Sequence, residues 1–307
     1  MTPSQRILVI GAGELGYQVL RFLAEHPERQ DTTVSVLLRP GNLSPESPRK
    51  TTVDSLRKLG IHIVTGDIVT DPEQTLISTF EPYDTIISCM GFASGSGTQI
   101  KLTRAVLSAG IKQYIPWQFG VDYDAIGRGS AQDVFDEQLD VRDLLRSQTK
   151  TSWAIISTGM FTSFLFEPSF GVVNIKDATI CALGSWQNRV TVTTPQDIGK
   201  ITAEIVLGQE RASLFTNQAI FIGGDTISYG ELAELVEKIT RKPFRRTLLT
   251  VGDAQNALAQ DPVNTLLKYQ IVFGQGRGVS WELSETWNEQ RGIHALTAAE
   301  WAEDNIV

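Results

Sequence analysis

Short apolar runs alternate with helical patterns through the first half of the chain, and this alternation limits the folds it can adopt. The run ILVIG at 7–11 contains no polar side chain, as expected of a strand buried on both faces. The segment 14–25 then places apolar residues at helical spacing before Pro27. Further strands are expected at 33–39, 61–65, 84–90, 114–117 and 153–158. Such alternation is typical of parallel βαβ units, so the sequence predicts an α/β fold with a doubly wound parallel sheet.

The second half is less regular and predicts a smaller α/β domain that binds the substrate. Residues 160–195 are rich in Phe, Gly and Ser, with short strand-like runs. A helix is expected at 196–208 and a strand at 219–223, and Ser228 and Glu231 have the spacing of a capping box. The predicted boundaries are 1–159 for the nucleotide-binding domain, with 191–224 returning to it, and 160–190 plus 225–307 for the substrate-binding domain.

A glycine motif follows the first predicted strand and opens the first predicted helix. It reads G-x-G-x-x-G and consists of Gly11, Ala12, Gly13, Glu14, Leu15 and Gly16. In this context Gly11 allows a tight turn, Gly13 lets a pyrophosphate approach the backbone, and Gly16 lets the helix pack closely on the strand. The helix N-terminus supplies free N–H groups to the phosphates. A turn without a ligand is the alternative, but the strand–turn–helix context favours a Rossmann domain that binds NAD(P).

The end of the second predicted strand distinguishes NADP from NAD. NAD enzymes usually carry Asp or Glu there, on the ribose 2′-hydroxyl, whereas this chain has Leu38-Arg39-Pro40. A guanidinium suits a 2′-phosphate by its charge and its fork geometry. Arg49 and Lys50 lie in the following loop and could close over the same phosphate. The sequence therefore favours NADP(H), with an ordinary exposed arginine as the alternative for Arg39.

Two further segments are expected at the edge of the sheet where its strands end. They are Met90-Gly91-Phe92-Ala93, after the fourth strand, and Trp117-Gln118-Phe119, after the fifth. The first should pass beneath the cofactor, with Gly91 allowing close backbone approach, and Gln118 should face the cofactor too. Trp117 and Phe119 are expected to line the nicotinamide and substrate pocket. Because neighbours on a strand face opposite sides, at least one of these two rings is expected in the core instead.

Composition narrows the classes of partner. The chain has 27 Lys+Arg against 35 Asp+Glu, a net charge of −8, which disfavours nucleic acid. No apolar run reaches the roughly 18–20 residues of a membrane helix, and MTPSQR at the start has no signal-peptide pattern. Cys89 and Cys181 form no disulfide framework or CxxC spacing. A cytoplasmic protein without membrane contact is therefore expected.

The usual catalytic motifs are missing from the sequence. No Y-x-x-x-K, H-E-x-x-H, P-loop or G-x-S-x-G pattern occurs. The three histidines, His26, His62 and His294, form no ligand cluster, so no metal is expected.

Taken together, these residues resemble the NmrA-like, isoflavone reductase-like family, a fungal type of atypical short-chain dehydrogenase/reductase. The resemblance covers nearly the whole chain and rests first on the glycine loop at 11–16, on Arg39 and on Gly66-Asp67. The segment YIPWQFG at 114–120 is similar to the family's F-I-P-S-x-F-G, and the segment from Phe135 to Arg142 is similar to its F-x-x-K-x-x-(I/V)-R. The segment TPQDIG at 194–199 also resembles the family. It implies an NADP(H)-dependent reductase of a small aromatic or conjugated carbonyl or enone, in fungal secondary metabolism.

One departure from the family pattern concerns the catalytic residue. The lysine of F-x-x-K-x-x-(I/V)-R, which the resemblance implies to be the acid/base, is Gln138 here. Glutamine cannot exchange a proton near neutral pH and can only orient a substrate by hydrogen bonds. A proton would then come from Tyr123, Asp122 or water, with Gln138 and Gln118 orienting the carbonyl.

Three interpretations of function stay open. The first is a reductase of a hydrophobic substrate, with Met160, Phe161 and Phe164 as a pocket wall; plain core packing is the alternative for these three residues. The second is a non-catalytic regulator that senses NADP(H), as NmrA does, and needs a protein partner. The third is a non-redox enzyme, an isomerase or dehydratase, on the same scaffold. A homodimer is compatible with all three.

Overall fold

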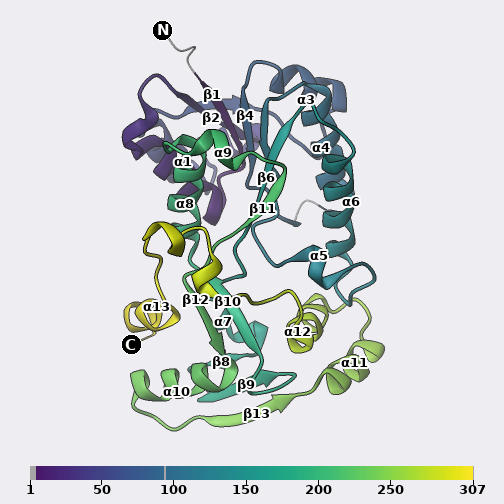
Figure 1. Cartoon of the computed structure of the whole chain (residues 1–307), viewed down its shortest axis with the longest axis vertical. Coiled ribbons are helices and arrows are strands. Elements are labelled where there is room, and N and C mark those ends of the chain that lie inside the picture. The colour runs from purple at the N-terminus through teal and green to yellow at the C-terminus, as the bar shows by residue number, and fades with distance from the viewer. Residues whose placement is uncertain (1–4, 93–94, 307) are drawn as a thin grey trace. The chain divides into compact units, whose positions relative to one another are not determined.

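The computed structural model describes residues 5–92 and 95–306, so Ala93 of the predicted loop lies outside the described residues. Its largest sheet has seven strands (Figure 1). In spatial order they are β11 (Gln218–Phe221), β6 (Ser152–Ser157), β5 (Gln113–Ile115), β4 (Thr85–Ser88), β1 (Arg6–Ile10), β2 (Thr33–Leu38) and β3 (His62–Thr65). Every pair from β6 to β3 is parallel. The predicted doubly wound parallel sheet is confirmed.

The strand order reverses direction beside β1. The chain runs outward from β1 through β2 to β3, and then crosses back to β4 on the other side of β1. In open α/β sheets a crevice forms at such a switch point, outside the carboxyl ends of the strands. This topology marks the end of β1 as the place for a ligand.

Helices cover both faces of this sheet. They are α1 (Glu14–Glu25), α2 (Lys50–Lys58), α3 (Glu73–Phe80), α4 (Thr98–Ser108), α6 (Val134–Arg146), α8 (Pro195–Leu207) and the short α9 (Arg211–Leu214). Helix α1 lies against α8, because a Cβ on Gly199 would come within 2.7 Å of the main chain at Gln18. Helix α3 lies against α4.

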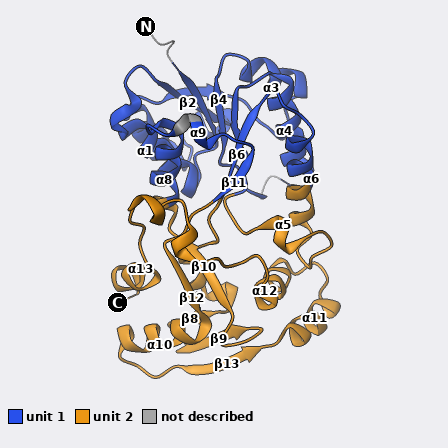
Figure 2. Ribbon diagram, viewed as in Figure 1, with its two compact units in different colours: residues 1–118, 140–156, 198–220 blue, residues 119–139, 157–197, 221–307 orange. Residues whose placement is uncertain are grey.

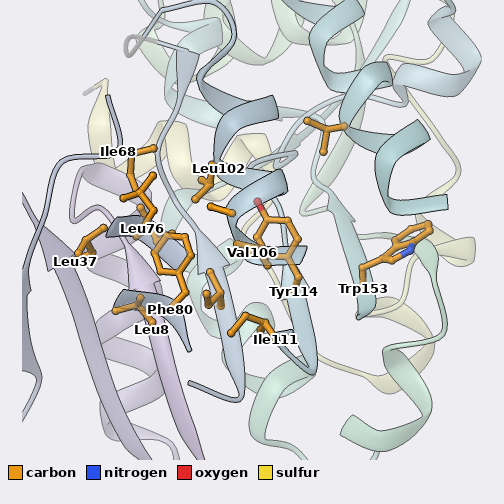
Figure 3. Close-up of a cluster of buried hydrophobic side chains, with 14 of the residues drawn as sticks. Leu8, Leu37, Ile68, Leu76, Phe80, Leu102, Val106, Ile111, Tyr114 and Trp153 are labelled. Atoms are coloured by element: carbon orange, nitrogen blue, oxygen red, sulfur yellow. The ribbon is translucent and has the colours of Figure 1, made fainter. Parts of the chain in front are cut away.

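The core of this unit lies between the sheet and the layer of α3, α4 and α6. Leu8 of β1, Tyr114 of β5 and Trp153 of β6 meet Phe80 and Val106 from the helices, and all five are buried (Figure 3). Apolar side chains from successive strands and helices therefore form one cluster, and the burial of this cluster stabilises the unit.

A second compact unit comprises residues 119–139, 157–197 and 221–307 (Figure 2). Its described residues form two three-stranded sheets. The first consists of β12 (Asp225–Ser228), β10 (Arg189–Thr193) and β7 (Met160–Phe161), and the second of β13 (Arg245–Leu249), β9 (Thr179–Leu183) and β8 (Val173–Asn174). Its helices are α5 (Tyr123–Ile126), α7 (Thr162–Leu165), α10 (Tyr229–Thr240), α11 (Val251–Gln260), α12 (Thr265–Gln275) and α13 (Ala298–Asn305). The capping box predicted at Ser228 and Glu231 is present at the start of α10.

The two units divide the chain differently from the predicted domains at 119–139, 157–159, 191–197 and 221–224. Residues 191–197 belong to the second unit, because β10 pairs with β7 and β12 and not with the large sheet. Residues 119–139, predicted in the first domain, also belong to the second unit. The prediction extended the βαβ pattern to 159, and no local signal marks where the chain leaves the large sheet after Gln118.

We predict that Phe80→Ala destabilises the first unit by about 3–5 kcal/mol, because it removes a fully buried ring from the cluster of Figure 3. Val263→Ala, at a side chain that is 82% exposed, serves as the control and should stay within about 0.5 kcal/mol of the parent. Denaturant unfolding followed by far-UV circular dichroism measures both. Equal midpoints for the two variants would show that the cluster does not stabilise the unit.

Candidate dinucleotide site

The glycine turn has the geometry that its motif predicts. Gly11 has a φ of +90°, in the region that favours glycine, and its N–H donates to the Leu37 carbonyl at 3.2 Å. At Gly16 a Cβ would lie 2.3 Å from the Gly11 carbonyl oxygen and 3.1 Å from the Cβ of Cys89. A side chain at Gly16 is therefore sterically excluded, and its absence lets α1 pack onto the turn after β1.

Gly13 differs from its two partners, since it faces space. It is the N-cap of α1, with a φ of −71°, and in the described part of the chain a Cβ there would meet no heavy atom within 4 Å. No described side chain caps the N-terminus of α1. Its first N–H groups consequently keep the capacity to bind an anion, assisted by the partial positive charge of the helix end.

A cavity of about 300 Å³ opens over this turn, entirely within the first unit. Its walls come from the ends of β1, β2 and β4, from the turn after β3 and from the start of α2, and its lining residues are Ile10, Gly11, Ala12, Gly13, Leu37, Leu38, Arg39, Asn42, Arg49, Thr52, Val53, Gly66, Ile68, Cys89, Met90 and Gly91. The cavity lies at the switch point of the sheet, where the topology places a ligand.

Two guanidinium groups line one end of the cavity. Arg39 follows β2, and Arg49 directly precedes α2. The Arg39 Nε lies 3.5 Å from Oδ2 of Asp67, and the Arg39 side chain is 52% exposed. Ion pairs this exposed are weak, so the Arg39 head group can turn to another anion at little cost. The sequence pattern pointed to Arg39, with Arg49 and Lys50 after it; Arg39 and Arg49 line the cavity, whereas Lys50 is not among its lining residues.

Several residues of this wall were not predicted from the sequence. Asn42 and Thr52 line the cavity, and Asp67 faces Arg39. Asn42 lies in the connection between β2 and α2, whereas Thr52 lies in the first turn of α2, and neither belongs to a motif of fixed spacing. The available signal was the scatter of amide and hydroxyl residues from Asn42 to Thr52.

Gly91 and Trp117 form a contact at the other end of the cavity. Met90 and Gly91 line it, and a Cβ on Gly91 would lie 3.0 Å from the Trp117 indole. The Met90 carbonyl accepts a hydrogen bond from Gln99 Nε2 at 2.8 Å, which fixes this loop. Phe92 and Trp117 are half-buried, and neither is among the lining residues. Burial raises the pKa of the Cys89 thiol, so this lining cysteine is neutral and a poor nucleophile.

The Gln118 side chain is fully buried, and its amide oxygen accepts a hydrogen bond from Arg142 Nε at 2.7 Å. This oxygen is therefore held by Arg142, and the predicted contact of Gln118 with the cofactor stays a prediction. Gln138 lies one helical turn before Arg142 on α6 and is also fully buried.

The remaining predicted catalytic residues lie in the second unit. Oδ1 of Asp122 accepts hydrogen bonds from the N–H groups of Asp124 and Ala125, which caps α5. Tyr123 is buried, with its ring edge-on to Phe135 at 4.9 Å between centroids. These contacts give both residues structural roles, and their catalytic roles stay predictions.

The predicted aromatic wall is divided by the structure. Met160 and Phe119 are buried, and Phe164 stacks on Phe170 with centroids 4.5 Å apart. Phe161 is half-buried at the start of α7. Core packing accounts for Met160 and Phe119, whereas Phe161 and Phe164 are both half-buried, and their role as a pocket wall stays a prediction.

Neither a metal cluster nor a membrane span is found in the described part of the chain. Across residues 5–92 and 95–306, no cluster of three or more His, Cys, Asp or Glu side chains could hold a metal ion. Among those same residues, no helix combines the length and the apolar character that a bilayer crossing requires.

A doubly wound sheet with a glycine turn at its switch point defines a Rossmann-type protein of the NAD(P)-binding class. The model of the NmrA-like family matches residues 3–292, so the chain belongs to that family. An NmrA-like family domain-containing oxidoreductase of Gibberella moniliformis is 45% identical over 307 residues, which are 99% of either protein.

Solved structures agree on the fold. A crystal structure of isoflavone reductase superposes with a TM-score of 0.80 at 18% identity, covering 99% of this chain and 100% of that one. The structure described as AtPrR2 with NADP+ and (+)pinoresinol gives a TM-score of 0.76 at 21% identity, covering 99% of both chains.

The glycine geometry yields a paired prediction. Gly13→Ala should keep the thermal midpoint of the parent but weaken NADPH binding about tenfold or more, because the added methyl projects toward the space that the cofactor needs. Gly16→Ala should lower the midpoint by several degrees, because its methyl overlaps the Gly11 carbonyl. Thermal unfolding and NADPH titration, applied to both variants, distinguish the two roles. Unchanged NADPH affinity in Gly13→Ala would remove this turn from the binding site.

Proposed function

We propose that the chain is an NADP(H)-dependent oxidoreductase. The observation that carries the proposal is the cavity at the switch point, with the glycine turn at its centre and the guanidiniums of Arg39 and Arg49 at one end. A pyrophosphate would rest on the N-terminus of α1, and a 2′-phosphate between the two arginines. Two similarities support the proposal: the 45% identical relative is named an oxidoreductase, and AtPrR2 binds NADP+ together with pinoresinol.

The residues present fit this cofactor at each group. Gly13 leaves space beside the N–H groups of α1, the two arginines match the extra phosphate in charge, and Gly91 lines the cavity without a side chain. When bound, NADPH supplies the hydride. The chain's own residues bind and orient it, and Trp117 covers Gly91 at the end of the cavity opposite the arginines.

The substrate that we propose is a small aromatic or conjugated carbonyl or enone. The half-buried indole of Trp117 packs against Gly91, which lines the cavity, and an aromatic substrate bound beside Gly91 would make offset or edge contacts with this ring. Two proteins of similar fold are an isoflavone reductase and one that binds pinoresinol. A cytoplasmic location and a role in fungal secondary metabolism complete the proposal.

A second candidate function is an NADP(H) sensor without turnover, and Gln138 favours it. An amide at this buried position cannot give or take a proton near neutral pH. In the reductase, the proton would come from Tyr123, Asp122 or water. A non-redox isomerase or dehydratase is the third candidate, which the same amide leaves open.

The deciding experiment is titration with NADPH and NADP+, followed by addition of quinones, enones and aromatic ketones. Substrate-dependent loss of the reduced nicotinamide absorbance establishes the reductase. Binding without loss of absorbance across the panel supports the sensor, and conversion of a carbonyl compound at constant absorbance supports the non-redox enzyme. Absence of dinucleotide binding refutes all three.

We predict that Arg39→Asp shifts the preference from NADPH toward NADH by about 10–100-fold, the range expected when a charge-assisted hydrogen bond to phosphate is lost. The matched control is Arg57→Asp on α2, where the side chain is 55% exposed and pairs with Asp54. Dissociation constants for both cofactors measure the shift. The same ratio in Arg39→Asp as in the control would contradict the assignment of the 2′-phosphate site.

We predict that Gln138→Lys raises turnover of a reducible panel substrate about 10–100-fold if the chain is a weak reductase, because it adds a general acid. Gln138→Met, of similar length and without a titratable group, is the control and should not gain activity. Steady-state rates at saturating NADPH measure the effect, with thermal midpoints to verify folding. Equal rates for both variants would show that position 138 does not reach the reacting atoms.

A further inference from the structure

Strand β13 is the terminal strand of its sheet in the second unit. The sheet order is β13-β9-β8, and β13 pairs with β9 in parallel over all five of its residues. In the described part of the chain, no strand pairs with the outer edge of β13, which Figure 1 draws at the margin of that unit. The main-chain groups along this edge are therefore open to a further strand.

The direction of these groups follows from the hydrogen bonds toward β9. The N–H of Arg245 and the carbonyl of Leu249 both bond to main chain at the two ends of β9, at 2.8 Å each. Because the N–H and C=O of one strand residue point to the same side, and alternate residues point to opposite sides, Arg246 and Leu248 present theirs outward. An extended peptide can form up to four hydrogen bonds there.

Side chains along the edge add an apolar site. Leu248 is 45% exposed, which is high for a leucine in a sheet. Arg246 lies beside it on the same face and is held by Glu237 at 2.6 Å and by the Trp186 ring at 5.9 Å. The edge is thus ordered, with one exposed apolar side chain.

A cluster of cations borders this edge. Arg241, Lys242 and Arg245 are exposed, and among the described residues none of the three is paired with a carboxylate. This cluster of three positive side chains stands on a chain whose net charge is −8. Charge of the opposite sign in a partner would be attracted to this strip and opposed by the net negative charge of the chain.

We propose that β13 is a docking edge for an extended acidic peptide segment of a partner protein. The segment adds a strand beside β13, places acidic side chains near Lys242 and Arg245, and places an apolar side chain against Leu248. This docking edge lies in the second unit alone and does not depend on the reductase activity.

The test measures binding of a fluorescein-labelled peptide of alternating aspartate and valine to the full chain by fluorescence anisotropy. Two control peptides isolate the two contributions. Alternating lysine and valine reverses the charge. N-methylation of alternate amides in the acidic peptide removes its strand hydrogen bonds and keeps its charge. We expect each control peptide to bind at least about tenfold more weakly.

Two variants of the chain locate the site. Lys242→Glu with Arg245→Glu should weaken binding about tenfold, whereas the same reversals at Lys150 and Arg104, exposed cations outside the strip, should not. Leu248→Pro removes an outward N–H, which an edge strand tolerates, and should abolish binding, while Leu248→Ala keeps that N–H and should retain part of it. Circular dichroism and thermal midpoints verify that each variant folds.

Several results would overturn the proposal. Equal binding of the N-methylated peptide, together with equal competition by a DNA oligonucleotide of the same charge, would show a general polyanion surface. A peptide-independent dimer in sedimentation that Leu248→Pro dissociates would assign the edge to a second copy of the chain. If the acidic peptide does not bind, the proposal is wrong, and the cations at this edge serve only to protect it from aggregation.

Discussion

The tightest constraint in the nucleotide-binding unit is the contact between Gly16 and the carbonyl of Gly11, since a Cβ at Gly16 would come within 2.3 Å of that oxygen. This approach sets α1 directly on the turn after β1. It follows that the N-terminus of α1 opens at the carboxyl end of β1, beside the crossing to β4, and that Gly13 is left facing space. The cavity is thus a consequence of one packing contact that a methyl group would abolish.

The sequence predicted well those features that depend on local pattern. The strands of the large sheet, the glycine turn and the capping box at Ser228 all follow from periodicity or from fixed spacing between neighbouring residues. The pairing of β10 with β7 and β12 could not be predicted in the same way, because strand partners distant in sequence leave no local mark. The Asp122 carboxylate, which the sequence offers as an acid, caps α5, and its catalytic role stays a prediction.

Arg39 shows how a charge can be available for a ligand and still be held in place. Oδ2 of Asp67 lies 3.5 Å from the Arg39 Nε, which is near enough to orient the guanidinium. Because the Arg39 side chain is 52% exposed, this ion pair is too weak to compete with a phosphate that carries up to two charges. Arg39, which its charge marks as a phosphate ligand, is therefore oriented by Asp67, for which the sequence predicted no role in the site. Arg49, at the start of α2, adds a second positive charge to the same end of the cavity.

In helix α6, folding stability and proton transfer place opposite demands on the residue at position 138. Arg142 is a fully buried cation whose Nε bonds to the Gln118 amide, and Gln138 lies four residues before it on the same helix. A lysine at 138 would place two cations one turn apart in a buried setting, where their repulsion and the loss of hydration both lower the pKa of the amine. That lowering is what suits a lysine to proton transfer near neutral pH, and it costs folding stability. The amide at Gln138 removes this electrostatic strain, and with it the means of moving a proton at that position.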